Sequence, residues 1–291
     1  MRVIDFLIKP LRKIAKKAPI KLPHRGRGLV YVGLGIVLFV VFLAVFAPIL
    51  TPYDPTKRAG KPFQPPSGTH FFGTNKLGRD MWSRIVYGAR TVLLVVFSAV
   101  ALSMAIGIPL GLLSGYYGGK IDRGLSMFMD ALYAFPSLVL AIALAVALGP
   151  SLINAAIAIA VVYVPTYFRM IRGEVLSVKE ELFIEMDKVL GFPTRVIMFK
   201  HILPHLIPTI MVVFSLSAAD AVLTEAALSY LGLSVPYPTP DWGYDLYRGK
   251  GFILSGYWWL IFFPGLMITL LAAGFALIGE GLSEQVRRFE S

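Results

Sequence analysis

Long apolar stretches alternate with polar segments along the whole chain. Six of these stretches approach or exceed the roughly 20 residues that an α-helix needs to cross about 30 Å of hydrocarbon. We therefore expect an all-α polytopic membrane protein in which six transmembrane helices leave both termini on one side. The expected helices cover Leu29–Leu50, Thr91–Leu113, Leu125–Leu148, Leu152–Phe168, Leu206–Leu231 and Tyr257–Ile278.

The first apolar stretch, 29–50, carries no charged residue and follows a basic segment, as a secretory signal also would. It is longer than the roughly 7 to 15 apolar residues of such a signal, and no A-x-A cleavage site follows. A retained transmembrane helix is therefore predicted. The next segment, 51–88, contains five prolines, which disfavour long helices, so we expect an extracytoplasmic loop leading into a short helix near Arg79–Tyr87.

Composition supports the membrane interpretation, because 56% of the 291 residues are hydrophobic and only 15% are charged. Cysteine is absent, which excludes disulfides and thiolate ligands, and the four histidines form no HExxH-like pair, so no metal site is expected. The net charge of +11 might suggest nucleic acid, but residues 1–28 alone hold nine Lys/Arg against one acid, Asp5. A basic block before an apolar run indicates a cytoplasmic tail on anionic lipid, with no nucleic-acid partner.

The distribution of basic residues predicts the orientation of the helices. On the side of the basic tail lie 19 of the 28 Lys/Arg, and the opposite side holds 9. Since positive residues accumulate in cytoplasmic segments, both termini and the segment between the fourth and fifth helices are expected in the cytoplasm.

That segment, residues 171–205, is long and amphipathic. Ser177 to Glu180 has the pattern of a capping box, which predicts a helix start, and Gly191 and Pro193 predict the end of that helix. A second short helix is expected over Thr194–Leu203, ending at Pro204. An apolar stripe on such a projecting segment predicts docking into a groove of another protein.

The spacing Glu185-x5-Gly191-x9-His201-x-Leu203-Pro204 resembles the EAA loop of binding-protein-dependent ABC importer permeases. Met186 and Asp187 stand where that family has two alanines, and His201 stands where it usually has isoleucine. Two further stretches, His70–Thr91 and Glu225–Gly243, resemble the dipeptide/oligopeptide (peptide/nickel) branch and its C-type subunit.

The resemblance implies a type I importer permease fold in the cell (inner) membrane, with residues 89–282 as the transmembrane domain, 171–205 as its coupling loop and 283–291 as a cytoplasmic tail. It implies a peptide importer in which this chain forms half of the pathway beside a homologous B-type permease. Two ABC ATPases, which bind ATP and Mg, and an extracytoplasmic solute-binding protein would complete the complex. The coupling residues would be Glu185, Met186, Asp187, Gly191, His201, Leu203 and Pro204.

The chain itself is predicted to be non-catalytic and to bind no cofactor. The stretch GLLSGYYGGK only superficially resembles a phosphate-binding loop, because Ser114 stands where the first glycine is needed and Ile121 where Ser/Thr would bind Mg²⁺. ATP hydrolysis is therefore expected on separate subunits.

Polar and small residues inside the predicted spans suggest further roles. A four-residue spacing predicts close helix packing along one stripe, formed by Ser103, Gly107, Gly111 and Gly115. Three intramembrane acids, Asp130, Asp220 and Glu225, are expected either to line a translocation path or to tie helices together. The alternative function that they suggest is an ion-coupled secondary carrier. Trp242, Trp258 and Trp259 are expected as interfacial anchors.

Overall fold

The computed structural model describes residues 24–287. Most of the predicted basic tail (1–28) and the end of the predicted C-terminal tail (283–291) lie outside the described residues. Within 24–287 the chain is helical, with loops, one isolated bridge between Thr74 and Asp80, and no strand. The elements are α2 (His24–Val45), α3 (Ala47–Leu50), α4 (Met81–Tyr117), α5 (Gly119–Tyr133), α6 (Ser137–Leu148), α7 (Leu152–Val178), α8 (Leu182–Val189), α9 (Thr194–Val196), the π-helix η1 (Ile197–Ile202), α10 (Leu203–His205), α11 (Ile207–Tyr230), α12 (Trp242–Gly249), the 3₁₀-helix η2 (Lys250–Ser255) and α13 (Trp259–Arg287).

Five helices within the described part are long and apolar enough to cross a membrane, namely α2, α4, α7, α11 and α13. A sixth crossing is possible only as the pair α5 and α6, which bend by 88° relative to each other. The predicted span Leu125–Leu148 therefore corresponds to the second half of α5 and the whole of α6, with a sharp bend between them. The break falls at residues 134–136, where Pro136 disfavours a helical conformation of the residue before it and lacks an N–H for the helix.

The remaining boundaries differ from the sequence prediction at helix ends. The separate short helix near Arg79–Tyr87 does not exist, because α4 runs unbroken from Met81 to Tyr117. Asp80 caps this helix by accepting the N–H of Ser83 at 2.8 Å.

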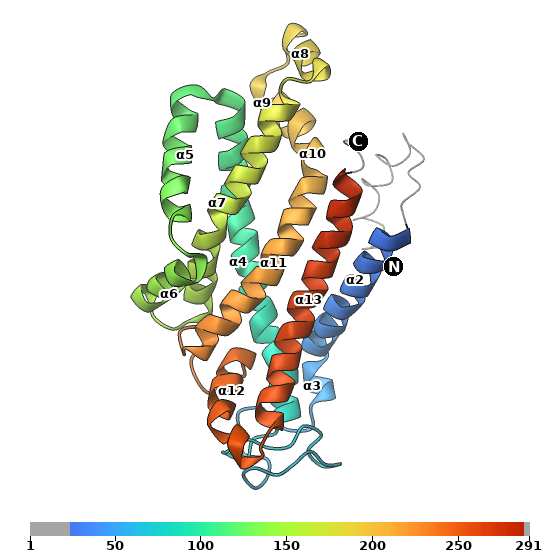
Figure 1. Ribbon diagram of the computed structural model, residues 1–291, viewed down its shortest axis with the longest axis vertical. Coiled ribbons are helices and arrows are strands. Elements are labelled where there is room, and N and C mark those ends of the chain that lie inside the picture. Colours follow the sequence, from blue (N-terminus) through green and yellow to red (C-terminus); the bar gives the residue numbers. More distant parts are fainter. Residues whose placement is uncertain (1–23, 288–291) are drawn as a thin grey trace.

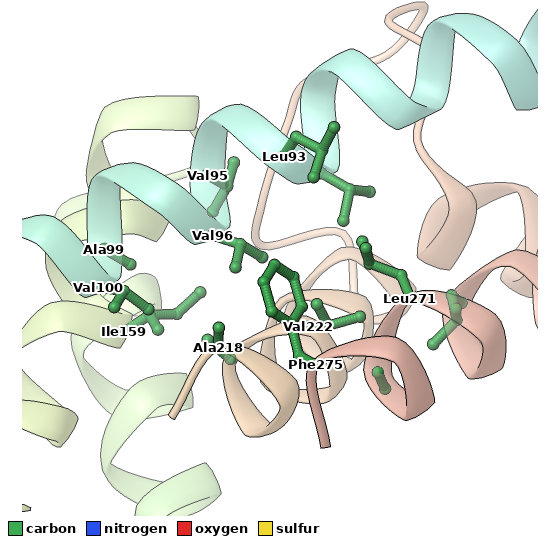
Figure 2. Close-up of a cluster of buried hydrophobic side chains, with 14 of the residues drawn as sticks. Leu93, Val95, Val96, Ala99, Val100, Ile159, Ala218, Val222, Leu271 and Phe275 are labelled. Carbon is green, nitrogen blue, oxygen red and sulfur yellow. The ribbon is translucent and has the colours of Figure 1, made fainter. Parts of the chain in front are cut away.

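The core is formed where α4, α7, α11 and α13 meet. Figure 2 shows apolar side chains of α4 directed at those of the other three helices. The buried residues labelled there are Leu93, Val95, Val96, Ala99 and Val100 of α4, Ile159 of α7, Ala218 and Val222 of α11, and Leu271 and Phe275 of α13. The four helices therefore form one packed body.

The small-residue stripe of α4 lies directly against α7. Ser103 Oγ donates to the carbonyl of Ala160 at 3.0 Å. A Cβ added at Gly107 would lie 2.6 Å from Cβ of Tyr167, and one at Gly111 would lie 2.8 Å from the carbonyl oxygen of Phe168. Gly115 likewise meets Val175, with 2.8 Å between the added Cβ and that of Val175. The stripe thus permits close packing within the subunit.

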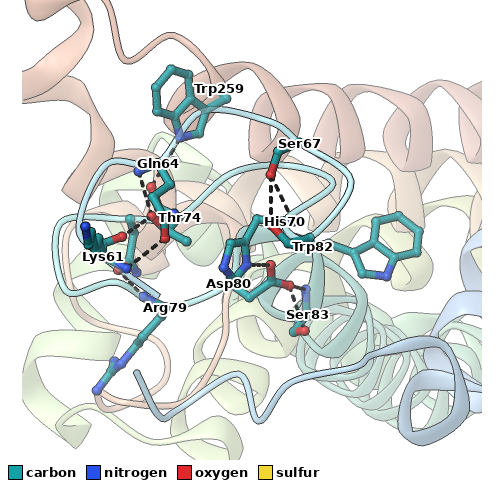
Figure 3. A network of polar contacts seen from close by, with 12 residues as sticks. Lys61, Gln64, Ser67, His70, Thr74, Arg79, Asp80, Trp82, Ser83 and Trp259 are labelled. Carbon is teal, nitrogen blue, oxygen red and sulfur yellow. Dashed lines mark hydrogen bonds and ion pairs between the residues drawn. The ribbon is translucent and has the colours of Figure 1, made fainter. Parts of the chain in front are cut away.

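The polar loop 51–80 lies at one end of the bundle (Figure 1), and its polar contacts are drawn in Figure 3. His70 Nδ1 lies 2.8 Å from Asp80 Oδ1, and both side chains are buried. Trp259 Nε1 donates to the carbonyl of Thr74 at 3.2 Å, which joins the loop to α13. Trp242 is also buried and donates to the carbonyl of Ile85 at 2.9 Å. The prediction of interfacial anchors is therefore wrong for Trp242 and Trp259, since their indole N–H groups have partners inside the protein, whereas Trp258 is half exposed.

The two ends of the bundle differ in structure (Figure 1). The start of α2, the end of α13 and the hairpin that carries α8 lie toward one end, while α12 and the loop 51–80 form the other. A Cβ at Gly26 of α2 would touch Gly281 and Glu284 of α13, so these two helix ends are neighbours.

Candidate functional site

The segment between α7 and α11 projects from one end of the bundle as a hairpin with α8 near its tip (Figure 1). The predicted capping box does not start a helix, because α7 continues through Ser177 to Val178. The next helix begins only after Glu181, whose backbone is extended. Ser177 is thus held in the last turn of α7, where the N–H of Lys179 donates to the carbonyl of Val175 at 3.0 Å.

Gly191 ends α8 as the sequence suggests. Its φ of +77° is in the left-handed region, which glycine adopts without the steric cost of a Cβ. The N–H of Gly191 donates to the carbonyl of Lys188, and the N–H of Phe192 donates to the carbonyl of Asp187, both at 3.1 Å. This pair of bonds is a Schellman motif, which fixes the direction in which the chain leaves the helix.

The predicted end at Pro204 is wrong. Helical structure runs from Thr194 through His205 and, after one turn residue at Leu206, continues into α11. Pro204 follows the π-helix η1 directly, in the short helix α10, and does not end the helical structure. The hairpin is therefore continuous with the transmembrane helix that follows it.

The hairpin is anchored to the bundle by one apolar cluster. Ile184 of α8 is completely buried there, and the other buried members are Leu112, Ile171, Val175, Ile197, Met198, Ile202 and Leu206. These residues come from α4, α7, η1 and the start of α11. The cluster therefore joins α8 to three of the long helices.

Apart from Gly191 at the turn, the predicted coupling residues form three pairs in different environments. Glu185 and Met186 are exposed on α8, whereas Leu203 and Pro204 are partly buried at the base of the hairpin. Asp187 and His201 face each other across the elbow, with 2.5 Å between Asp187 Oδ2 and His201 Nδ1. Two of the three positions at which this sequence departs from the family pattern, Asp187 and His201, thus contact each other.

The tip of the hairpin has an apolar surface that nothing in the described chain covers. We call this surface the α8 face and define it by four exposed residues: Leu182, Met186, Val189 and Leu190. Val189 is 87% exposed although it is strongly apolar. An apolar surface of this kind at the end of a helical hairpin is typical of a docking surface.

The three intramembrane acids do not form one site. Asp130 on α5 is exposed and pairs with Arg169, whose Nη2 lies 2.7 Å from its Oδ1. Glu225 is completely buried and accepts a hydrogen bond from Ser234 at 2.9 Å. Asp220, midway along α11, accepts the hydroxyl of Tyr163 at 2.7 Å and lines a cavity of about 280 Å³.

The sequence did not predict the polar contacts that join helices near the end of the bundle that carries the hairpin. Arg172 of α7 donates from Nη2 to Asp122 of α5 at 2.7 Å, and Ser114 of α4 donates to the same carboxylate at 2.5 Å. Charges near the predicted helix ends were visible, but their pairing depends on the bend between α5 and α6. Within the described residues, no group of three or more side chains could hold a metal ion.

Comparison with known proteins assigns this bundle and its projecting hairpin to the transport permeases. Residues 107–288 match the family described as binding-protein-dependent transport system inner membrane component. Residues 27–66 match the N-terminal transmembrane domain of oligopeptide transport permease C. The chain belongs to the binding-protein-dependent transport system inner membrane components, and it is a multi-pass protein of the cell membrane.

Curated relatives agree with this assignment. The chain is 45% identical to the dipeptide transport system permease protein DppC of Alkalihalophilus pseudofirmus over 258 residues, covering 88% of this chain and 84% of that protein. It is 36% identical to the oligopeptide transport system permease protein OppC of Bacillus subtilis over 278 residues, covering 94% and 91%. It is 37% identical to the probable D,D-dipeptide transport system permease protein DdpC of Escherichia coli, covering 89% and 87%.

A solved chain of the inward-facing MetNI methionine ABC transporter shares the fold. The TM-score is 0.57 at 20% sequence identity, and the match covers 72% of this chain and 97% of that chain. The recognised family and the importer permease fold are thus confirmed. The alternative of an ion-coupled carrier is not supported, since its three acids lie apart and the relatives are permeases of another class.

Proposed function

We propose that the chain forms one half of the membrane pathway of an ATP-driven importer of di- or oligopeptides. A homologous B-type permease would supply the other half, two separate ATPases would bind ATP and Mg, and a solute-binding protein would deliver the cargo. The peptide class rests on the names of the relatives, which are dipeptide and oligopeptide permeases at 36–45% identity.

The end of the bundle that carries α8 is the cytoplasmic end. Two observations support this orientation. Basic residues are concentrated on the side of the N-terminal tail, as in cytoplasmic segments. The beginning of α2 and the end of α13 lie toward the same end as α8, so one assignment fits both termini and the hairpin (Figure 1).

The α8 face is the surface that docks on an ATPase, and its exposure is the observation that carries the proposal. Leu182, Val189 and Leu190 are each at least 70% exposed, while Ile184 on the same short helix is completely buried. One side of α8 thus packs against the bundle, and the opposite side is available to bind a partner. A helix that offers apolar side chains to a groove is a common recognition mode.

The apolar cluster around Ile184 provides the mechanical link. It joins α8 to Leu112 of α4, Val175 of α7 and Leu206 at the start of α11. Because packed cores move as bodies and do not deform continuously, displacement of α8 by a closing ATPase would tilt these helices together. ATP-driven closure would in this way alternate access to the pathway.

Co-purification of the assembled complex tests this proposal. Val189→Asp places a charge on the α8 face without disturbing the core, since Val189 is 87% exposed. Leu254→Asp is the matched control, because Leu254 is an equally apolar, fully exposed residue in η2 near the opposite end. We expect Val189→Asp to lose the ATPases while retaining the partner permease, and Leu254→Asp to retain both. Retention of the ATPases by Val189→Asp would overturn the docking assignment.

A further inference from the structure

The cavity beside Asp220 lies where the bent pair α5 and α6 faces α7 and α11. It has a volume of about 280 Å³, which is room for several water molecules. Polar groups from three elements reach its wall, namely Ser137 of α6, Tyr163 and Thr166 of α7, and Asp220 of α11. The break between α5 and α6 lies beside this space, because Leu132, Tyr133 and Phe135 next to the break all line it.

Asp220 is the acid that faces this space. It lies near the middle of α11, and its side chain is exposed to the cavity. It accepts one hydrogen bond, from Tyr163, and within the described residues no basic side chain lies within ion-pair distance. Acids within membrane-spanning helices usually face a water-filled cavity or pair with another polar group, and Asp220 faces the cavity.

The other two intramembrane acids are already satisfied in ways that Asp220 is not. Asp130 pairs with Arg169 at the surface of α5. Glu225 is enclosed by protein and bonded to Ser234. Only Asp220 of these three combines an exposed carboxylate with a cavity.

The aromatic wall of the cavity suits the same kind of ligand. Tyr133 lines the cavity, and the guanidinium carbon of Arg169 already lies 3.9 Å from the centre of its ring. Aromatic faces attract cations, and a carboxylate forms charge-assisted hydrogen bonds with an ammonium group. Hydroxyl groups of Thr166 and Ser137 can accept the remaining N–H donors.

We propose that this cavity is a subsite on the translocation path that binds an ammonium group of the cargo at Asp220. This inference rests on the proposed function, since the cargo is taken to be a peptide that carries a free α-amino group or a basic side chain. The subsite would favour cationic over anionic groups of the cargo during transport, without selecting a particular peptide sequence.

The chain offers a direct test because it contains no cysteine. A single reporter thiol, Ser137→Cys, is placed in the cavity of the complete complex, with the partner subunits also made cysteine-free. The thiol is then modified with a cationic trimethylammonium-ethyl methanethiosulfonate or with its anionic sulfonatoethyl counterpart. We expect the cationic reagent to be favoured about tenfold beyond its preference for a free thiol, since a charged cleft concentrates counter-ions to that extent.

Asp220→Asn should return the ratio of the two rates to that of a free thiol. The control variant Glu280→Gln should leave the ratio unchanged, because Glu280 is an exposed acid of α13, a helix that contributes no described residue to the cavity wall. An unchanged ratio in Asp220→Asn would overturn the proposal, as would the absence of any reaction at the reporter. Thr166→Cys serves as a second reporter if the first variant does not assemble. Co-purification of the ATPases tests the proposed function, and the ratio of modification rates tests the subsite. The two measurements are independent, so failure of one claim is distinguishable from failure of the other.

Uptake assays then identify which ammonium group binds. With saturating loaded binding protein, the uptake of dialanine and of lysylalanine is compared between wild type and Asp220→Asn. An equal severalfold loss for both peptides assigns the α-amino terminus, and a loss for lysylalanine alone assigns the side chain. No loss for either peptide would contradict a role of the subsite in transport.

Discussion

Asp187 and His201 join the two sides of the hairpin elbow, with 2.5 Å between the Oδ2 of the first and the Nδ1 of the second. Asp187 belongs to the last turns of α8, and His201 lies in η1 beyond Gly191 and Pro193. The ring of Phe192 meets the ring of His201 edge-on, with centroids 5.5 Å apart. The elbow is thus held by a side-chain bond in addition to its backbone turn.

This pair predicts a compensating double variant. Asp187→Ala and His201→Ile each remove one partner, and each should lower the uptake obtained per ATP hydrolysed. A hydrogen bond of this kind contributes about 0.5–1.5 kcal/mol to stability. The pair is partly exposed, so its contribution lies at the low end of that range. The double variant restores the residues usual in the family, and it should therefore recover most of the coupling. Purely additive losses would show that the two residues act independently.

The turn at Gly191 predicts a graded series of variants. Nothing lies within 4 Å of a Cβ placed there, so only the backbone conformation restricts the residue. Gly191→Asn should retain coupling because asparagine tolerates the left-handed region, whereas Gly191→Ala should lose about 1–2 kcal/mol of local stability. Gly191→Pro should uncouple ATP hydrolysis from uptake, since it also removes the N–H bonded to Lys188.

Membrane insertion and complex assembly of all three variants provide the control for this series. The ratio of peptide imported to ATP hydrolysed in proteoliposomes is the measurement. Normal coupling in Gly191→Pro would show that the direction of the elbow does not matter.

Two glycines that differ only in their surroundings test the packing of α4 on α7. Gly111→Ala places its methyl group 2.8 Å from the carbonyl oxygen of Phe168, and it should destabilise the subunit. Gly173→Ala in α7 meets nothing within 4 Å, and it should stabilise by up to about 1 kcal/mol through helix propensity. Opposite shifts in the thermal midpoint of the purified subunit are expected. Equal shifts would contradict the close approach of the two helices.

A buried ion pair joins α4 to α12 near the opposite end. Arg84 Nε lies 2.8 Å from Oδ1 of Asp245, and the two side chains are 1% and 5% exposed. Burial raises the pKa of Asp245, and Arg84 opposes that rise. Arg84→Met should therefore destabilise the subunit by about 3–5 kcal/mol, because it leaves an unpaired buried carboxylate.

The double variant Arg84→Met/Asp245→Leu removes both charges, and most of the lost free energy of unfolding should return. Unfolding in mixed micelles measures the difference between the two variants. A double variant that is no more stable than Arg84→Met would show that the packing of these side chains, not their charge, is decisive.

Much of the architecture could be predicted from the sequence because apolar length and breaker residues act locally. The span Leu206–Leu231 is observed as Ile207–Tyr230, and the turn at Gly191 is found where a permissive backbone was expected. The conformation of a residue was less predictable where it depends on the packing of segments distant in the sequence. Ser177 has the pattern of a helix start, yet it lies inside the last turn of α7.

The candidate site was predictable as a segment but not as a set of contacts. Glu185 and Met186 lie on the projecting helix as expected, whereas the contact of Asp187 with His201 depends on the angle of the elbow. Trp242 was misplaced because its indole N–H finds the carbonyl of Ile85, a partner more than 150 residues away. Partners at such sequence separation have no signature in local periodicity.

Cross-linking from Val189 tests the central claim most directly, because this residue projects from the α8 face and is 87% exposed. A photoactivatable benzophenone is attached to Val189→Cys in the complete complex, and the same group at Leu254→Cys is the control. We predict that irradiation joins the subunit to an ATPase from position 189 and not from position 254. An adduct with an ATPase from position 254 and none from position 189 would contradict the account.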